Sequence, residues 1–328
     1  MVRPDFFPFS LEGKKRSDEL SYSLAMTGSV VPHLLYLDGT PKTAALKAAA
    51  TGFTANFRRV TLPLSLPGLL MLWGRDVQAY EMIGNYNVIR SPIQPKDLDE
   101  ATKKACHDET LKLYYDSRQQ NDEMTDMLCN IEWAQASVTS FMSCCSIAPE
   151  CLTAVLSGAI TNLWTAIEMF TGDLWEAALN CHPQELSQLK GRRSGAEQPK
   201  MDISHIHRHD YNLAEVMGTL LKDRYKFTNY HSIKDAYSDA FARDFPDIDT
   251  IIPPEIDALD CARNLLVHRA GIVDDKFIGR TRNSGLFGQL AVGDQMPVNG
   301  PIFSTFSVAT ATAAASLYRA VDDWIAAH

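Results

Sequence analysis

The sequence has no long apolar run that is free of polar residues. Its N-terminus, MVRPDFFPFSLEGKKRSDEL, lacks the continuous apolar segment of a signal peptide. The most apolar later stretch, residues 151–167, is too short and too rich in Ser, Thr and Asn to form a transmembrane helix. We therefore expect a soluble, cytoplasmic protein with no membrane partner.

The C-x-x-C spacing of cysteine pairs is also missing. The seven cysteines form an odd set without any C-x-x-C pair, and three of them lie in apolar stretches. Reduced thiols in the cytosol explain this pattern better than disulfides or a zinc ribbon.

An overall excess of basic residues is absent as well, because the net charge is −9. This charge excludes a protein that coats nucleic acid along its whole surface. Two short segments carry a net positive charge although the chain as a whole is acidic. Residues 190–200 hold four basic residues and one acid, and residues 263–282 hold five basic residues and two acids, so each segment carries a local +3. A small site for an anionic ligand therefore remains compatible with the sequence.

Residues 1–95 differ in composition from the rest of the chain. They hold eight of the sixteen prolines, and their ten basic and seven acidic residues sum to +3. The other 233 residues have 21 basic and 33 acidic residues, or −12. Pro and Gly interrupt short apolar pieces such as VVPHLLYL and VTLPLSLPGLLMLW, which predicts strands and loops rather than long helices. We therefore expect a mixed or β-containing N-terminal segment, of unknown role, that ends near residue 95.

Residues 96–328 have the composition of a mainly α-helical domain. Residues 148–181 are apolar around nearly all of their helical circumference until Glu168, as expected of the central helix of a bundle. PPEIDALDCARNLLVHRAG predicts a helix that begins after two prolines and ends at Gly271. GQLAVGDQMPVNGP, residues 288–301, predicts a small β-hairpin excursion before a final helix.

The helix predicted for residues 255–270 carries polar residues that suit phosphate chemistry. His268 lies in the last turn, where the negative end of the helix macrodipole favours a protonated imidazole. Arg263 supplies a permanent charge with a planar fork that matches a phosphate. Asn264 and His268 share a helix face, whereas Arg263 and His268 are about 140° apart around an ideal helix. One copy of the helix therefore does not direct Arg263 and His268 at one small substrate.

The same residues also allow a purely structural interpretation. His268 and Arg269 can cap the C-terminus of the helix, and Arg263 can pair with Asp260 or Asp257. Spacing alone favours this interpretation, because basic residues are common near helix ends.

The motif RNLLVH resembles the R-x4-6-H signature of the HEPN superfamily, in its common form Arg-Asn-x-x-x-His. The continuation RAGIVDDKFI is similar to that of many HEPN proteins of bacterial defence and toxin systems. The earlier stretch NLWTAIEMFTGDLWEAALN resembles a long helix of such proteins, with Glu168 followed by the pair Asp173 and Leu174. The hairpin-like segment before the last helix is also similar. The resemblance covers residues from about 150 to 328.

The resemblance implies a HEPN-like helical bundle that forms a homodimer and brings two copies of the motif into a shared cleft. Active family members are endoribonucleases that need no metal. By this resemblance, His268 takes the proton from a ribose 2′-OH or protonates the leaving 5′-oxygen, which leaves a 2′,3′-cyclic phosphate. Arg263 of one chain steadies the phosphorane charge next to His268 of the other, and Asn264 orients the histidine or the phosphate.

The resemblance also implies further residues and partners. Glu168 is either a hydrogen-bond partner of Arg263 in the cleft or a buried acid satisfied by a neighbour, and Arg269 is expected to bind the RNA substrate. A defence or toxin–antitoxin setting implies an antitoxin or sensor partner. Family members that have lost activity serve as dimerisation modules or bind RNA or nucleotides, and a non-catalytic module of this kind is the alternative function.

The stretch SHIHRHD places His205, His207 and His209 at alternate positions. In a strand the three imidazoles would project from one face, as the ligands of a metal-dependent phosphodiesterase can. We favour a solvated loop, because metal sites usually draw ligands from several elements and the HEPN mechanism needs none. We therefore predict no metal and no cofactor. The residues around this loop that we expect to line the RNA approach are Arg192, Arg193 and Arg208.

Overall fold

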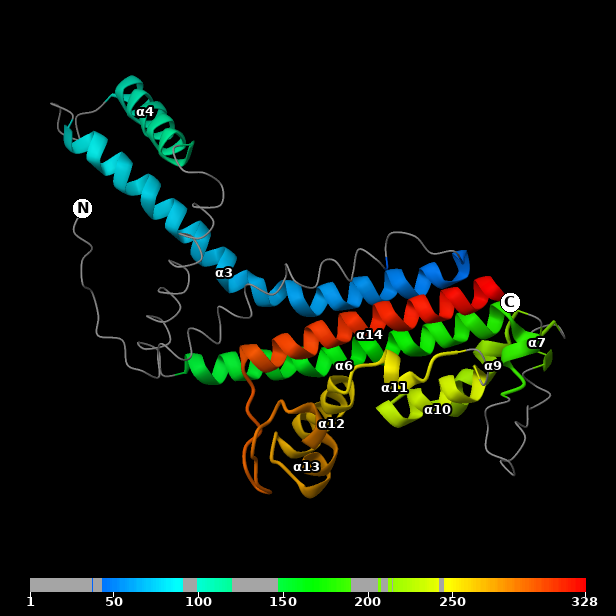
Figure 1. Cartoon of the computed structure of the whole chain (residues 1–328). Helices are drawn as coiled ribbons and strands as arrows, with labels where there is room; N and C mark the ends of the chain where they lie inside the picture. The colour runs from blue at the N-terminus through cyan, green and yellow to red at the C-terminus, as the bar shows by residue number, and fades with distance from the viewer. Residues whose placement is uncertain are drawn as a thin grey trace. The chain divides into compact units, whose positions relative to one another are not determined.

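The computed structural model describes residues 37, 43–90, 99–119, 147–189, 206–207, 212–213, 215–241 and 245–328. These residues are mainly α-helical and none of them lies in a β-strand, which confirms the prediction of a mainly α fold (Figure 1). Among them, no helix has both the length and the apolar character needed to cross a bilayer.

Two compact units make up the chain. The first, which we call the α3–α4 unit, includes the described residues 63–90, 99–119 and 147–149. The second, the main unit, includes residues 37, 43–62 and the described part of 150–328. The boundary that composition predicts near residue 95 falls outside the described residues.

The prediction of strands before residue 95 is wrong for residues 47–90, which form the single helix α3, Lys47–Arg90. VTLPLSLPGLLMLW lies inside this helix, whereas VVPHLLYL lies outside the described residues except for Leu37. A proline removes one backbone donor, yet a helix continues through it when the flanking residues are held in helical conformation. The N-terminal part of α3 is held by packing, because Phe53 and Phe57 are buried and the ring of Phe53 lies 5.0 Å from that of Phe170.

In the α3–α4 unit, α4 spans Glu100–Gln119. Its first turn is capped by Asp99, whose Oδ1 accepts a hydrogen bond of 2.8 Å from the backbone N–H of Thr102. Tyr80 of α3 contacts the ring of His107 through its hydroxyl. Asp99 and the Tyr80–His107 contact therefore fix the start and one side of α4.

Two long helices, α6 (Ala148–Cys181) and α14 (Gly300–Ala327), form the core of the main unit together with the N-terminal part of α3 (Figure 1). Trp164, Trp175 and Tyr318 are fully buried between these helices and their neighbours. Burial on this scale stabilises the unit chiefly through the hydrophobic effect, at about 25 cal/mol per Å² of apolar surface. The predicted central helix of the bundle corresponds to α6.

The shorter elements of the main unit follow α6 in the chain, except for η1. They are η1 (Ala44–Leu46), which precedes α3, and α7 (Pro183–Leu186), α9 (Met217–Tyr225), α10 (Tyr230–Ala240), α11 (Ile248–Ile251), α12 (Glu255–Arg269), α13 (Asp275–Thr281) and η3 (Arg282–Ser284). Helix α10 packs on α6. Trp175 Nε1 donates to the backbone carbonyl of Ala236 at 2.9 Å, and the hydroxyl of Tyr237 donates to the backbone carbonyl of Thr171 at 2.8 Å.

Residues 289–299 do not form the predicted β-hairpin. Their alternating segment pairs instead with the chain that leaves α12, through one antiparallel bridge between Ile272 and Gln295. The N–H of Val273 donates to Asp294 O at 2.9 Å, and that of Met296 donates to Gly271 O at 2.8 Å. Gly293 and Met296 therefore donate to the chain that leaves α12, whereas the N–H of Asp294 donates to Ala291 O within a local turn.

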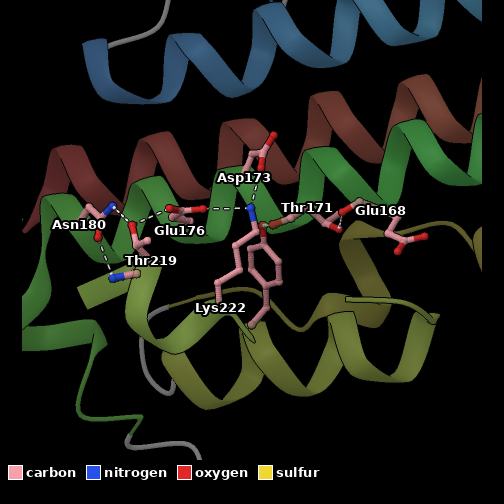
Figure 2. A network of polar contacts seen from close by, with 9 residues as sticks. Glu168, Thr171, Asp173, Glu176, Asn180, Thr219 and Lys222 are labelled. Atoms are coloured by element: carbon pink, nitrogen blue, oxygen red, sulfur yellow. Dashed lines mark hydrogen bonds and ion pairs between the residues drawn. The ribbon is translucent and has the colours of Figure 1, made fainter. Parts of the chain in front are cut away.

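A polar network joins α9 to α6 (Figure 2). Lys222 Nζ lies 2.7 Å from Asp173 Oδ1 and 2.9 Å from Glu176 Oε2. Thr219 donates to Glu176 Oε1 at 2.6 Å. Partial burial lowers the pKa of Lys222, but its hydrogen bonds to the two carboxylates outweigh burial and raise the pKa overall. The lysine therefore stays charged and ties α9 to the polar side of α6.

Gly218 lies where α9 approaches α6 most closely. A Cβ at this position would come within 2.1 Å of the carbonyl oxygen of Glu176, and the Gly218 N–H donates to Asn180 Oδ1 at 2.7 Å. We expect Gly218→Ala to lower the free energy of unfolding by at least about 1–3 kcal/mol, because backbone must move to admit the methyl group. Urea unfolding followed by circular dichroism measures the loss.

Gly158→Ala is the matched control, because this glycine lies in α6 with nothing within 4 Å of its Cβ position. Its free energy of unfolding should stay level or rise by up to about 1 kcal/mol, since alanine is the better helix former. Equal unfolding midpoints for the two variants would contradict the close approach of α9 to α6.

Candidate functional site

The C-terminus of α12 ends in a left-handed turn that fixes the last helical residues. Ala270 has φ 51° and Gly271 has φ 81°, and the N–H of Gly271 donates to Leu265 O at 3.0 Å. Gln295 Nε2 donates to the carbonyl of Ala270 at 3.0 Å. A Cβ on Gly271 would lie 2.4 Å from that amide nitrogen and would displace the glutamine side chain, and the positive φ favours glycine here. The helix therefore stops where the sequence predicts.

A surface depression of about 310 Å³ opens beside this helix end. It lies between α12, α13 and the turn that joins them. Its lining residues are Cys261, Asn264, Leu265, His268, Arg269, Asp274, Lys276, Phe277 and Arg280. Three of the predicted site residues, Asn264, His268 and Arg269, therefore share one depression. His268 is exposed there.

Arg269 pairs with Asp274 within the depression, with 2.7 Å between Arg269 Nη1 and Asp274 Oδ2. Asp274 also caps α13 by accepting the N–H of Phe277 at 2.8 Å. These two hydrogen bonds, the backbone one first, lower the pKa of Asp274, so the carboxylate stays ionised. Lys276 has no acidic partner among the described residues. Lys276 and the exposed His268 are therefore the groups most open to an anionic ligand.

A chain of hydrogen bonds runs behind the depression. Arg263 Nη1 donates to Asn264 Oδ1 at 2.9 Å, and Asn264 Nδ2 donates to Asp260 Oδ1 at 3.0 Å. Arg280 Nη2 then donates to Asp260 Oδ2 at 2.8 Å and also contacts Asp257. Among the described residues, Arg263 thus bonds to Asn264 and makes no ion pair with Asp260 or Asp257, and it is Arg280 of α13 that contacts both carboxylates.

Arg263 does not line the depression that holds His268. It acts instead on Glu168 of α6. Burial raises the pKa of Glu168, and the charge of Arg263 opposes the increase without cancelling it. Arg263 therefore lies between Glu168, on which its charge acts, and Asn264, to which it donates and which lines the depression together with His268 and Arg269.

The remaining predicted residues cannot be placed. Arg192, Arg193, Arg208, His205 and His209 lie outside the described residues. In the part of the chain that the structure describes, no cluster of three or more His, Cys, Asp or Glu side chains is arranged to hold a metal ion. The role of the three histidines therefore stays a prediction.

Sequence reasoning did not identify Asp260, Lys276 or Arg280 as site residues. Asp260 carries a signal, since it is an acid four residues before Asn264 within an apolar helix face. Lys276 and Arg280 come from α13, and only the tertiary structure brings them to the depression. Cys261 lies beside them, but burial raises its thiol pKa to about 12, which excludes a thiolate nucleophile at neutral pH.

Comparisons with protein-family models, curated proteins and solved structures find no match. The chemistry of the site residues therefore carries any functional conclusion.

The raised pKa of Glu168 predicts a pH-dependent effect of Glu168→Gln. A carboxyl whose pKa is raised by folding makes the folded state less stable once it ionises, that is, as pH rises from about 4 to 7. Glutamine does not ionise. The free energy of unfolding of the variant, minus that of the wild type, should therefore be more positive at pH 7 than at pH 4 in urea titrations.

Glu176→Gln, on the same helix, provides a control of opposite sign. Burial raises the pKa of Glu176, but hydrogen bonds from Thr219 and Lys222 outweigh it and lower the pKa overall. The wild-type carboxylate then stabilises the fold at neutral pH and loses that contribution as pH falls. The same pH trend in both variants would contradict the assigned environments.

Proposed function

We propose that the chain is a metal-independent endoribonuclease of the HEPN type. The observation that carries the proposal is the depression in which His268 and Asn264 lie beside Arg269, Lys276 and Arg280. A histidine that moves protons next to cations that hold phosphoryl oxygens is sufficient for cleavage of an RNA phosphodiester without metal. The resemblance of RNLLVH to the R-x4-6-H signature supports the same activity.

In this reaction the ribose 2′-oxygen attacks the adjacent phosphorus and the bond from phosphorus to the 5′-oxygen breaks. His268 accepts the 2′-OH proton or donates a proton to the leaving 5′-oxygen. The products are a 2′,3′-cyclic phosphate and a 5′-OH. Cations around the phosphorus stabilise the additional negative charge of the pentacoordinate transition state.

The separation of Arg263 from His268 supports a homodimer as the active form. Because Arg263 does not line the depression of its own chain, we infer that it reaches a phosphate held by His268 from a second copy. In a symmetric dimer the same surfaces of both chains meet, so two sites form together, each with Arg263 from one chain and His268 from the other. Glu168, which lies within electrostatic range of Arg263, then helps to orient the guanidinium.

The proposal extends to partners. Arg269, with Arg192, Arg193 and Arg208, contacts the RNA on either side of the cleaved bond. A defence or toxin–antitoxin setting implies an antitoxin or sensor partner that controls the activity. The proposal also places the protein in the cytoplasm. No cofactor takes part in the proposed reaction.

The proposal predicts that purified protein cleaves a mixed RNA in the presence of EDTA and leaves cyclic-phosphate ends. His268→Ala should reduce the rate at least about 100-fold, the usual contribution of a general acid or base. His231→Ala is the matched control, because His231 is an exposed histidine on α10 outside the depression, and its rate should stay unchanged. Gel separation and enzymatic end analysis give rate and chemistry.

Two outcomes would redirect the assignment. Binding of RNA without cleavage, with or without a divalent metal, favours the non-catalytic dimerisation or nucleotide-binding module. Cleavage that EDTA abolishes and a divalent metal restores favours the metal-dependent phosphodiesterase built on His205, His207 and His209.

A further inference from the structure

We propose that Arg280 is the phosphate-binding arginine that serves His268 of its own chain. Both side chains line the same depression, which Arg263 does not. That the phosphate belongs to RNA rests on the proposed function, whereas binding of a phosphate group at this place does not.

Two carboxylates hold the Arg280 guanidinium through one of its three nitrogens. Nη2 donates to Asp260 and to Asp257, both of α12, and the side chain is 17% exposed. Burial lowers the pKa of Arg280, but the two hydrogen bonds outweigh burial and raise it, so the group is always cationic. Nε is buried and has no hydrogen-bond partner among the described residues. Nη1 makes no hydrogen bond to a described residue either, because both ion pairs use Nη2, and it is the donor left for a ligand.

The cation faces the depression and its acidic partners do not. Arg280 is among the lining residues, whereas Asp257 and Asp260 are absent from the lining, and Asp260 has no exposed surface at all. An anion in the depression can therefore contact the guanidinium, whereas the carboxylates of Asp257 and Asp260 lie behind it. Because the carboxylates belong to the helix that carries His268, they hold Arg280 in a fixed position relative to the imidazole, which reduces the cost of ordering it on binding.

Asn264 completes this arrangement. Its Oδ1 accepts from Arg263 and its Nδ2 donates one hydrogen to Asp260, which fixes the orientation of the amide. The second Nδ2 hydrogen has no assigned acceptor in the described residues and belongs to a side chain that lines the depression. Arg280, Lys276 and this N–H together offer a tetrahedral oxyanion three kinds of donor beside the imidazole of His268.

The test is a titration with inorganic phosphate, followed by the NMR signal of the His268 ring. His268→Ala assigns the signal. Arg280→Lys keeps the charge and the ion pair with Asp260 but loses the planar fork, so we expect at least about tenfold weaker phosphate binding. Arg282→Lys is the matched control, because Arg282 lies two residues away, is exposed and lines a different hollow, and its affinity should match the wild type.

A second variant separates a binding role from a structural one. Asp257→Asn removes one acid behind Arg280, while Asp260 Oδ2 still holds Nη2 at 2.8 Å and keeps the guanidinium in place. We therefore expect phosphate to bind about threefold more tightly, because the local charge becomes more positive. If Arg280 served only the fold, Asp257→Asn would leave phosphate affinity unchanged or lower it.

The inference and the proposed function fail in different ways. Wild-type phosphate affinity in folded Arg280→Lys protein would overturn the inference, even if the wild type cleaves RNA. Weakened phosphate binding in Arg280→Lys together with no RNA cleavage by the wild type would uphold Arg280 as an anion-binding residue and overturn the ribonuclease. For RNA, the inference predicts a higher KM or a lower kcat in Arg280→Lys and no change in Arg282→Lys.

Discussion

Asp260 has no exposed surface, and groups from three helices satisfy its carboxylate. Its Oδ1 accepts from Asn264 of α12, and its Oδ2 accepts from Arg280 of α13 and, at 3.3 Å, from the N–H of Tyr230 at the start of α10. A buried charge without partners costs several kcal/mol, so these elements keep their places around it. The depression exists because α13 is held against α12 by this carboxylate and by Asp257.

Much of the helical part of the fold is readable from local signals. Asn229, Asp247, Asp274 and Asn299 each cap the helix that follows them, and each is a residue type that favours this position. Helix α3 was missed because Pro63 and Pro67 lie inside it and local propensity argues against a helix there. Upstream of these prolines, Phe53 and Phe57 are buried in the main unit, and sequence spacing does not show such packing.

The same distinction holds for the site. The Gly271 stop places His268 and Arg269 in the last turn of α12, and the spacing of four residues places Asn264 beside His268, so both features follow from the sequence. Arg280 could not be found in this way. Its ion pairs join residues 20 and 23 positions apart, and nothing in DDKFIGR distinguishes it from the other basic residues of the segment. The predicted hairpin was wrong for a similar reason, because Gln295 pairs with Ile272, a residue far from it in the sequence, and not within its own segment.

Two arginines thus have different relations to one histidine. Arg280 belongs to the depression of His268, whereas Arg263 points its donors to Asn264 and its charge to Glu168. In the proposed ribonuclease, a second chain brings Arg263 to the phosphate. The proposed dimer is thus part of the site and not only a mode of assembly.

A mixed dimer tests this requirement most directly. Arg263→Ala and His268→Ala chains, co-expressed with different affinity tags and purified through both, form dimers in which one of the two composite sites is intact. The account predicts that each variant alone is nearly inactive on RNA and that the mixed dimer recovers about half of the wild-type rate. A mixed dimer that forms but cleaves no faster than either variant alone would contradict a site shared between two chains.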